Sequence, residues 1–177
     1  MRKIYLFLVT FLSVIIGSNA QAQTDEIYKH NGDIIKGTVQ KVDEFTITFS
    51  YVNETSQNTI SKYAVAKIIY GQSGRVDNIT DKITLNGAKD WEKVIVLEDK
   101  TYIAGLKRVN EIRGKTAFIN FQTGNTGDKK ALKKLKEEAA KQNCPFILIT
   151  SDKATVGAES NYIGGSQNIK TGIAYSY

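Results

Sequence analysis

The chain has 177 residues, a formal net charge of +6 and 41% hydrophobic residues. This length allows one domain of ordinary size or two very small ones. The basic excess is small and mixed in sign, so it favours only weak contact with anionic surfaces and excludes a typical nucleic-acid binder. The single cysteine, Cys144, excludes an internal disulfide, so the hydrophobic core alone must supply the stability.

Residues 1–22 are predicted to be a secretory signal peptide. Arg2 and Lys3 form a positive start, residues 4–16 are almost wholly apolar, and Ala20 and Ala22 offer small side chains for cleavage. An uncleaved anchor is the alternative, but about 13 apolar residues are fewer than the ~20 that span a bilayer. Removing 22 of the 177 residues leaves 155 and lowers the charge from +6 to +4. We expect an exported protein, either periplasmic or secreted.

Five short strands are predicted in the domain expected at 23–71, namely 26–30, 34–42, 45–51, 59–61 and 66–70. A turn at 31–33 separates the first two, and Gly37 is expected to bend the second. In the third strand, apolar and hydroxylated residues alternate with period two. Five strands in about 45 residues predict a small closed barrel, because closure removes exposed sheet edges.

The spacing of apolar and glycine residues in this segment resembles a known group of sequences. The residues are Ile27, Gly32, Asp33, Ile35, Gly37, Val39 and Val42, followed by Ile60 and 66–70. The pattern resembles the N-terminal part of uncharacterised exported proteins from Bacteroidetes-type bacteria, and its layout is similar to small barrels of the Sm type. The resemblance implies export and a small barrel, and it includes no catalytic residue.

The next segments are predicted to lead into a second, α+β domain at 91–177. Residues 72–90 form a polar connector with at most one short strand, and 91–97 form an apolar strand. We expect extended or irregular structure at 102–112, because Gly105 and β-branched residues weaken its helical spacing. A turn is predicted at 113–115 and a strand at 117–121.

One convincing helix is predicted, beginning at Thr126 or Asp128 and ending near residue 142. On a helical wheel its packed face contains Ala131, Leu132, Leu135 and Ala139. Asn143 can end the helix in a left-handed conformation, and Pro145 prevents its continuation. A buried strand at 146–150 would complete a crossover onto the same sheet. A Gly164-Gly165 turn and a terminal strand complete a mostly β, α+β chain with one main helix packed on a sheet.

Catalytic and cofactor motifs are missing from the sequence. The loop 124–129 lies between a predicted strand and helix, but its glycine spacing and Asp128 do not fit a phosphate loop. His30 is the only histidine, so the usual zinc site and Ser-His-Asp triad lack parts. Acidic residues occur mostly as adjacent pairs, which point to opposite faces of a strand. We therefore predict no catalytic, cofactor or metal residues.

Two features are candidates for interaction. The solvent-exposed face of the helix offers a possible surface contact through Lys130, Lys133, Lys134 and Lys141. Such a face can also be merely solvated. Cys144 is predicted to be a small buried side chain, and an intermolecular disulfide or redox-sensitive thiol is the alternative.

The hypothesis for function is an exported binding or envelope-accessory protein without chemistry of its own, which contacts protein or envelope surfaces. A further motivation is a set of tyrosines that are expected to be exposed, with burial in the core as the alternative. They are Tyr51, Tyr162, Tyr175 and Tyr177. A hydrolase with a carboxylate-based site is the first alternative. A small outer-membrane β-barrel is the second, because the alternating C-terminal aromatics resemble the ends of such proteins.

Overall fold

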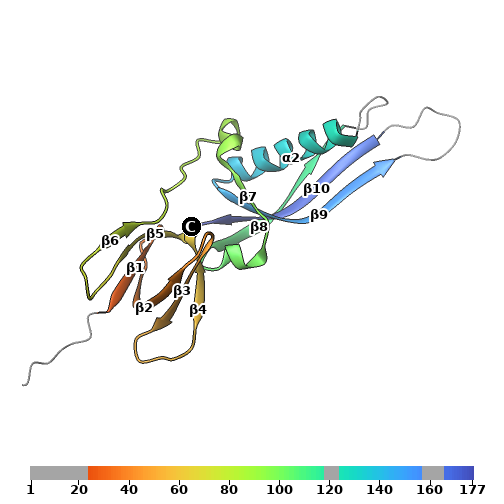
Figure 1. The fold of residues 1–177 in the computed structure, drawn as a ribbon. Coiled ribbons are helices and arrows are strands. Elements are labelled where there is room, and N and C mark those ends of the chain that lie inside the picture. The colour runs from red at the N-terminus through yellow and green to blue at the C-terminus, as the bar shows by residue number, and fades with distance from the viewer. Residues whose placement is uncertain (1–23, 118–123, 157–165) are drawn as a thin grey trace, which may run out of the picture.

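The computed structural model describes residues 24–117, 124–156 and 166–177, which form two β-sheets and one long helix (Figure 1). The predicted signal peptide and the Gly164-Gly165 turn lie outside the described residues, as does most of the strand predicted at 117–121. The described chain is mostly β with one main helix, which confirms the predicted α+β class. None of its helices has the length and apolar character that a membrane span requires.

The first sheet contains six strands in the order β4-β3-β2-β1-β5-β6, and every neighbouring pair is antiparallel. The strands are β1 Asp25–Lys29, β2 Ile34–Val42, β3 Thr46–Tyr51, β4 Asn58–Ser61, β5 Val65–Ile69 and β6 Val76–Asn78. The first five agree with the predicted strands to within one residue at each end. Their inward side chains form one core cluster, with Ile27, Ile47 and Ile68 fully buried.

The predicted five-stranded barrel is not found among the described residues, because the strand edges that would close it are occupied. β6 pairs along the outer edge of β5. The edge of β4 contacts another segment, where the Ser61 N–H donates a hydrogen bond to the Ala104 carbonyl oxygen at 2.8 Å. The six strands therefore form an open sheet whose edges are β4 and β6.

Gly37 has a different role from the predicted bend. A Cβ atom at this position would lie 2.1 Å from the carbonyl oxygen of Ser50, so only glycine lets β2 approach β3 this closely. The irregularity of β2 follows two residues later, as a register shift between Val39 and Lys41.

The second sheet has four strands in the order β7-β9-β10-β8. They are β7 Ile95–Leu97, β8 Lys107–Lys115, β9 Phe146–Val156 and β10 Ser166–Ser176, and the helix α2 Gly124–Lys141 covers one face (Figure 1). β7 pairs parallel to β9, whereas β10 pairs antiparallel to both β8 and β9. β8 and β9 therefore run parallel to each other, with β10 between them. The predicted crossover through α2 is present, but its first strand is β8.

Two local predictions in this half are wrong. Residues 113–115 belong to β8 and do not turn, because Gly114 lies under α2, where a Cβ atom would be 2.1 Å from the Ala131 carbonyl oxygen. The strand predicted at 91–97 begins only at Ile95, since residues 91–93 belong to a 3-10 helix, Ala88–Lys93. The packing of α2 on Gly114 and the 3-10 helix that contacts α2 therefore override the local sequence patterns.

The two sheets meet near the C-terminal residue (Figure 1). An aromatic cluster joins them there. The Tyr177 ring centroid lies 5.3 Å from that of Phe146 in β9 and 4.8 Å from that of His30, which follows β1. The Tyr177 hydroxyl accepts a hydrogen bond from the Ile83 N–H at 2.8 Å. The division into domains at 23–71 and 91–177 stays a prediction, and the connector at 72–90 supplies both β6 and this contact.

Candidate functional site

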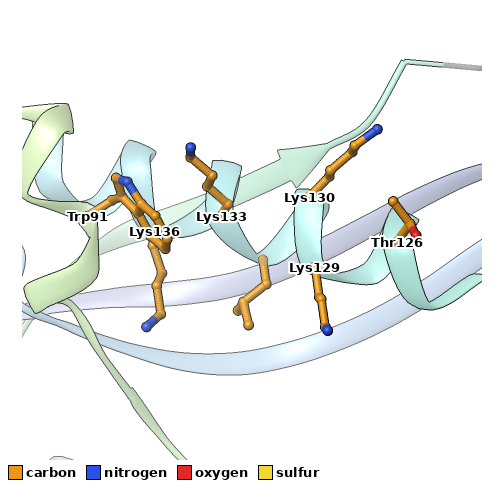
Figure 2. Close-up of a pocket in the computed structure, with 7 residues that line it drawn as sticks. Trp91, Thr126, Lys129, Lys130, Lys133 and Lys136 are labelled. Atoms are coloured by element: carbon orange, nitrogen blue, oxygen red, sulfur yellow. The ribbon is translucent and has the colours of Figure 1, made fainter.

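An open groove of about 450 Å³ runs along the outer surface of α2. It is lined by Trp91, Thr126, Lys129, Lys130, Leu132, Lys133 and Lys136. In Figure 2, Trp91 stands beside one end of this row, and the lysine side chains extend on both sides of the helix. The apolar part of the groove lining consists of Trp91, Leu132 and the aliphatic stems of the lysines.

Trp91 is placed by the 3-10 helix Ala88–Lys93 against the second half of α2. The Asp90 carboxylate accepts the Asn86 N–H at 2.8 Å and pairs with the Lys93 ammonium at 3.3 Å. The Asn86 N–H is the main cause that holds the pKa of Asp90 below its usual value, although burial opposes it. Val94 anchors the end of this segment because it is 1% exposed in the core beneath α2.

The opposite side of α2 fixes the helix to the sheet. Ala131, Leu135 and Ala139 are fully buried, as their spacing predicts. Asn143 has a φ of 55°, which confirms the predicted left-handed end of the helix. The Cys144 N–H then donates to the Ala139 carbonyl oxygen at 3.0 Å and closes the last turn.

The outer side of α2 concentrates positive charge. The helix contains six lysines and three acidic residues, so it holds a quarter of the 24 basic residues in the chain. Lys133 pairs weakly with Glu137 at 3.9 Å, and its ammonium lies 4.9 Å from the centroid of the Trp91 ring. Lys129, Lys130, Lys134 and Lys136 have no carboxylate within salt-bridge distance in the part of the chain that the structure describes.

The predicted contact residues separate into two groups. Lys130 and Lys133 line the groove. Lys134 is exposed but is not part of the lining, and Lys141 pairs with Glu138 at 3.2 Å. The assignment of Leu132 to the packed face is wrong, because this side chain is only half-buried and lines the groove.

Lys129, Lys136 and Trp91 line the groove but were not singled out in the sequence, and Thr126 was expected only as a helix start. The two lysines lie three residues before Leu132 and four residues after it, a spacing that places them beside this leucine on the helix. That spacing was a usable signal. The position of Trp91 follows from the tertiary fold, so no local pattern predicts it.

Cys144 lies at the C-terminal end of α2 and is 0% exposed. Its thiol donates to the Gln142 carbonyl oxygen at 3.4 Å. Burial raises the pKa of the Cys144 thiol, which favours the protonated and unreactive form. The predicted role as a small buried side chain fits this position, and a reactive thiol would require an exposure that Cys144 does not have.

A buried ammonium fixes the N-terminal half of α2 to the sheet. Lys170 of β10 is 5% exposed and pairs with Asp128 of α2 at 2.6 Å and with Asp152 of β9. Burial opposes the charged form, but the hydrogen bonds from Lys170 to both carboxylates dominate and raise the pKa of Lys170. Asp128, which rules out a phosphate loop, therefore has a structural role.

A second hollow of about 400 Å³ lies on the second sheet and is lined by Glu111, Arg113, Thr150, Ser151, Lys153, Ile169 and Thr171. Glu111 is the single carboxylate that lines either of these two hollows. In the described ranges, the acidic side chains with a shifted pKa are Glu26, Asp33, Asp90, Asp99 and Glu138, and hydrogen bonds lower each pKa. Neither hollow therefore offers the pair of acids that the hydrolase alternative needs.

The described part of the chain contains no group of three histidine, cysteine, aspartate or glutamate side chains that is able to hold a metal ion. Of the tyrosines considered for contact, Tyr51 is exposed, Tyr175 is buried and Tyr177 is half-buried between the two sheets. Tyr162 lies outside the described residues. No protein-family model matches this chain, and no significant match is found among curated proteins or solved structures.

Proposed function

We propose that the protein is an exported binding or envelope-accessory protein, which contacts an anionic surface of a protein or of the cell envelope through the groove on α2. One observation supports this proposal above all. The groove places Trp91 and Leu132 among lysines, of which Lys129, Lys130 and Lys136 have no acidic partner in the described chain. A strip of apolar surface edged by one sign of charge favours an amphipathic partner of the opposite charge.

Binding is favoured over catalysis by the chemistry of the lining. Lys129, Lys130, Lys133 and Lys136 supply positive charge, and no histidine, cysteine or carboxylate side chain of the described residues lines the groove beside them. A charged, open surface serves to attract a partner and to exclude similarly charged ones.

Export is part of the proposal and rests on the N-terminal sequence. The positive start, the apolar segment at 4–16 and the small residues at 20–22 are typical of a cleaved leader. The resemblance of 25–70 to exported Bacteroidetes-type proteins supports the same location. Mass spectrometry of the chain recovered from a bacterial host tests this directly, with a mature N-terminus near Gln23 expected and an intact N-terminus as the contradicting result.

Contact through the groove is tested with isolated cell envelopes and the purified, processed chain. The test variant changes Lys129, Lys130, Lys133 and Lys136 to Gln. The control variant changes Lys100, Lys107, Lys115 and Lys153 to Gln, which removes the same charge from other exposed positions. We expect the groove variant alone to lose at least about tenfold in envelope affinity, since each lysine contributes about 1 kcal/mol beside an anionic surface. Equal binding by all three proteins would contradict the proposal.

A further inference from the structure

We infer that the partner of the α2 groove is an anionic phospholipid surface, with the Trp91 ring placed at the level of the lipid headgroups. The inference rests on the proposed function and names the class of partner that the groove binds. Three properties of the groove favour lipid over an acidic protein: the type of cation, the position of the tryptophan and the distribution of charge along the helix.

The cations of the lining are all lysines. An arginine would offer a rigid fork for two hydrogen bonds, which suits a fixed carboxylate on a folded partner. Lysine offers a point charge on a flexible stem, which suits phosphates that move in a fluid layer. The lysine ammonium groups extend to both sides of the helix in Figure 2, so they can reach different headgroups at once.

Trp91 and Leu132 supply the apolar part of the contact. Tryptophan is favoured at membrane interfaces, because its large ring is apolar and its indole N–H is polar. The 3-10 helix holds Trp91 beside α2, with the Lys133 ammonium 4.9 Å from the centroid of its ring. The ring and the charge therefore lie beside each other on the outer side of α2, where one surface can contact both.

The charge runs along the helix and is not gathered at one point. The charged lining extends from Lys129 to Lys136, and these seven steps along the helix rise about 10 Å. Contact over such a length fits a flat or gently curved surface. No carboxylate of the described residues lines the groove, so an anionic leaflet meets no negative charge in the lining.

Trp91 is the only tryptophan in the chain, so tryptophan fluorescence, excited selectively over that of the nine tyrosines, reports on the groove alone. The probe is protein-free vesicles of phosphatidylcholine with about 30% phosphatidylglycerol, and vesicles of pure phosphatidylcholine serve as the lipid control. We expect sedimentation with the anionic vesicles, a blue shift of Trp91 emission and quenching by brominated lipid. Raising the salt from about 50 mM to about 500 mM should release the protein, because screening weakens contacts between exposed charges.

Variants separate groove binding from general attraction. Replacing Lys129, Lys130, Lys133 and Lys136 with Gln should lower vesicle affinity at least about tenfold. The Lys100, Lys107, Lys115 and Lys153 control should change it less than about threefold. Trp91→Phe should bind more weakly, because phenylalanine lacks the polar indole N–H, and should lose the tryptophan fluorescence signal. All replaced lysines are exposed or half-buried, and glutamine has a helix propensity close to that of lysine, so folding is preserved.

Two outcomes overturn the inference and are distinguishable from failure of the proposed function. If the groove variant loses binding to envelopes but the wild type ignores anionic vesicles, the proposed function holds and the partner is an acidic protein or polymer. If vesicles bind both lysine variants equally and Trp91 emission does not change, the protein binds lipid through another surface. Loss of binding to envelopes and vesicles in the groove variant alone supports both proposals.

Discussion

His30, the only histidine of the chain, shows how one side chain can set a pH dependence. Its Nε2 lies 2.9 Å from the Thr80 hydroxyl, which donates to the Val65 carbonyl oxygen at 2.8 Å. This arrangement assigns the Nε2–H tautomer to a neutral ring. Burial lowers the pKa of His30, the Lys82 ammonium adds to the effect, and the Asp81 carboxylate opposes it.

We predict that His30 makes the protein less stable as the pH falls through the mildly acidic range. The pKa of His30 is lower in the folded chain than the unfolded value of about 6.5, so the unfolded chain binds the proton first. The stabilisation is present above about pH 7 and is lost as the pH falls through the folded pKa. The urea midpoint should therefore decline between about pH 7.5 and pH 5.5, where ordinary carboxyls remain ionised.

The matched variant is His30→Gln, whose amide can still donate to Thr80 but does not titrate. Its urea midpoint should be nearly constant over the same pH range. An equal decline in both proteins would assign the pH dependence to another group.

Gly114 is a second position where one atom decides the local structure. An added Cβ would meet the Ala131 carbonyl oxygen at 2.1 Å and the Leu135 nitrogen at 2.5 Å, and neither backbone atom can turn aside. We predict that Gly114→Ala lowers the free energy of unfolding by about 3 kcal/mol, because α2 has to shift off β8. Urea unfolding measures this, and faster amide exchange in α2 should accompany it.

The control for this position is Gly74→Ala, which adds the same methyl group where nothing lies within 4 Å. Gly74 has a φ of 67°, so its replacement costs about 1 kcal/mol in backbone conformation alone. Equal losses at the two positions would show that α2 does not pack closely on Gly114.

At the scale of elements, structure that depends on neighbouring residues could be predicted from the sequence, and structure that depends on tertiary contacts could not. The first five strands of the first sheet and the helix α2 were predicted closely, because alternation, turn residues and caps act within a few residues. The turn at 113–115 failed because Gly114 serves a contact with a helix far along the chain. The barrel failed because Ala104 and β6 occupy edges that no local pattern identifies as taken.

The candidate site divides in the same way. Lys130 and Lys133 were predicted from the helical wheel, and the spacing of Lys129 and Lys136 from Leu132 would have identified these two as well. Trp91 and Lys133 come together only through the 3-10 helix and its anchor Val94. Leu132 was assigned to the packed face of α2, but it lies at the boundary with the solvent-exposed face.

The two leucines of α2 therefore make an element-scale prediction. Leu135 is fully buried under the helix, and Leu132 is half-buried in the groove. Leu135→Ala should lower the free energy of unfolding by about 2–5 kcal/mol, whereas Leu132→Ala should cost less than about 1 kcal/mol. Chemical denaturation of both variants checks the difference, and comparable losses would mean that the helix is rotated from the described orientation.

At the scale of the whole molecule, the decisive question is whether the two sheets unfold together. Their cores are not separate, because Leu106 packs on the first core and also joins the aromatic cluster between the sheets. Ala104 accepts a hydrogen bond from the edge of β4, and the Lys82 ammonium lies 5.6 Å from the Tyr177 ring centroid. Shared contacts of this kind couple the stabilities of their two sides.

We predict that Tyr177→Ala destabilises both sheets, although the residue directly follows β10 of the second one. The change removes ring contacts to Phe146 and His30 and leaves the Ile83 N–H without its acceptor, so it should cost about 2 kcal/mol. Tyr177→Phe is the control, since it keeps both rings in contact and should cost only about 1 kcal/mol.

Hydrogen exchange measured separately in β1 and in β9 tests the coupling. If one cooperative transition includes both sheets, Tyr177→Ala should lower amide protection in β1 and β9 by the same free energy. Faster exchange confined to β9 would instead mean that the regions 23–71 and 91–177 unfold as independent domains. In that case the aromatic cluster would join two independently stable units. The stability of α2 and its groove would then depend on the second sheet alone.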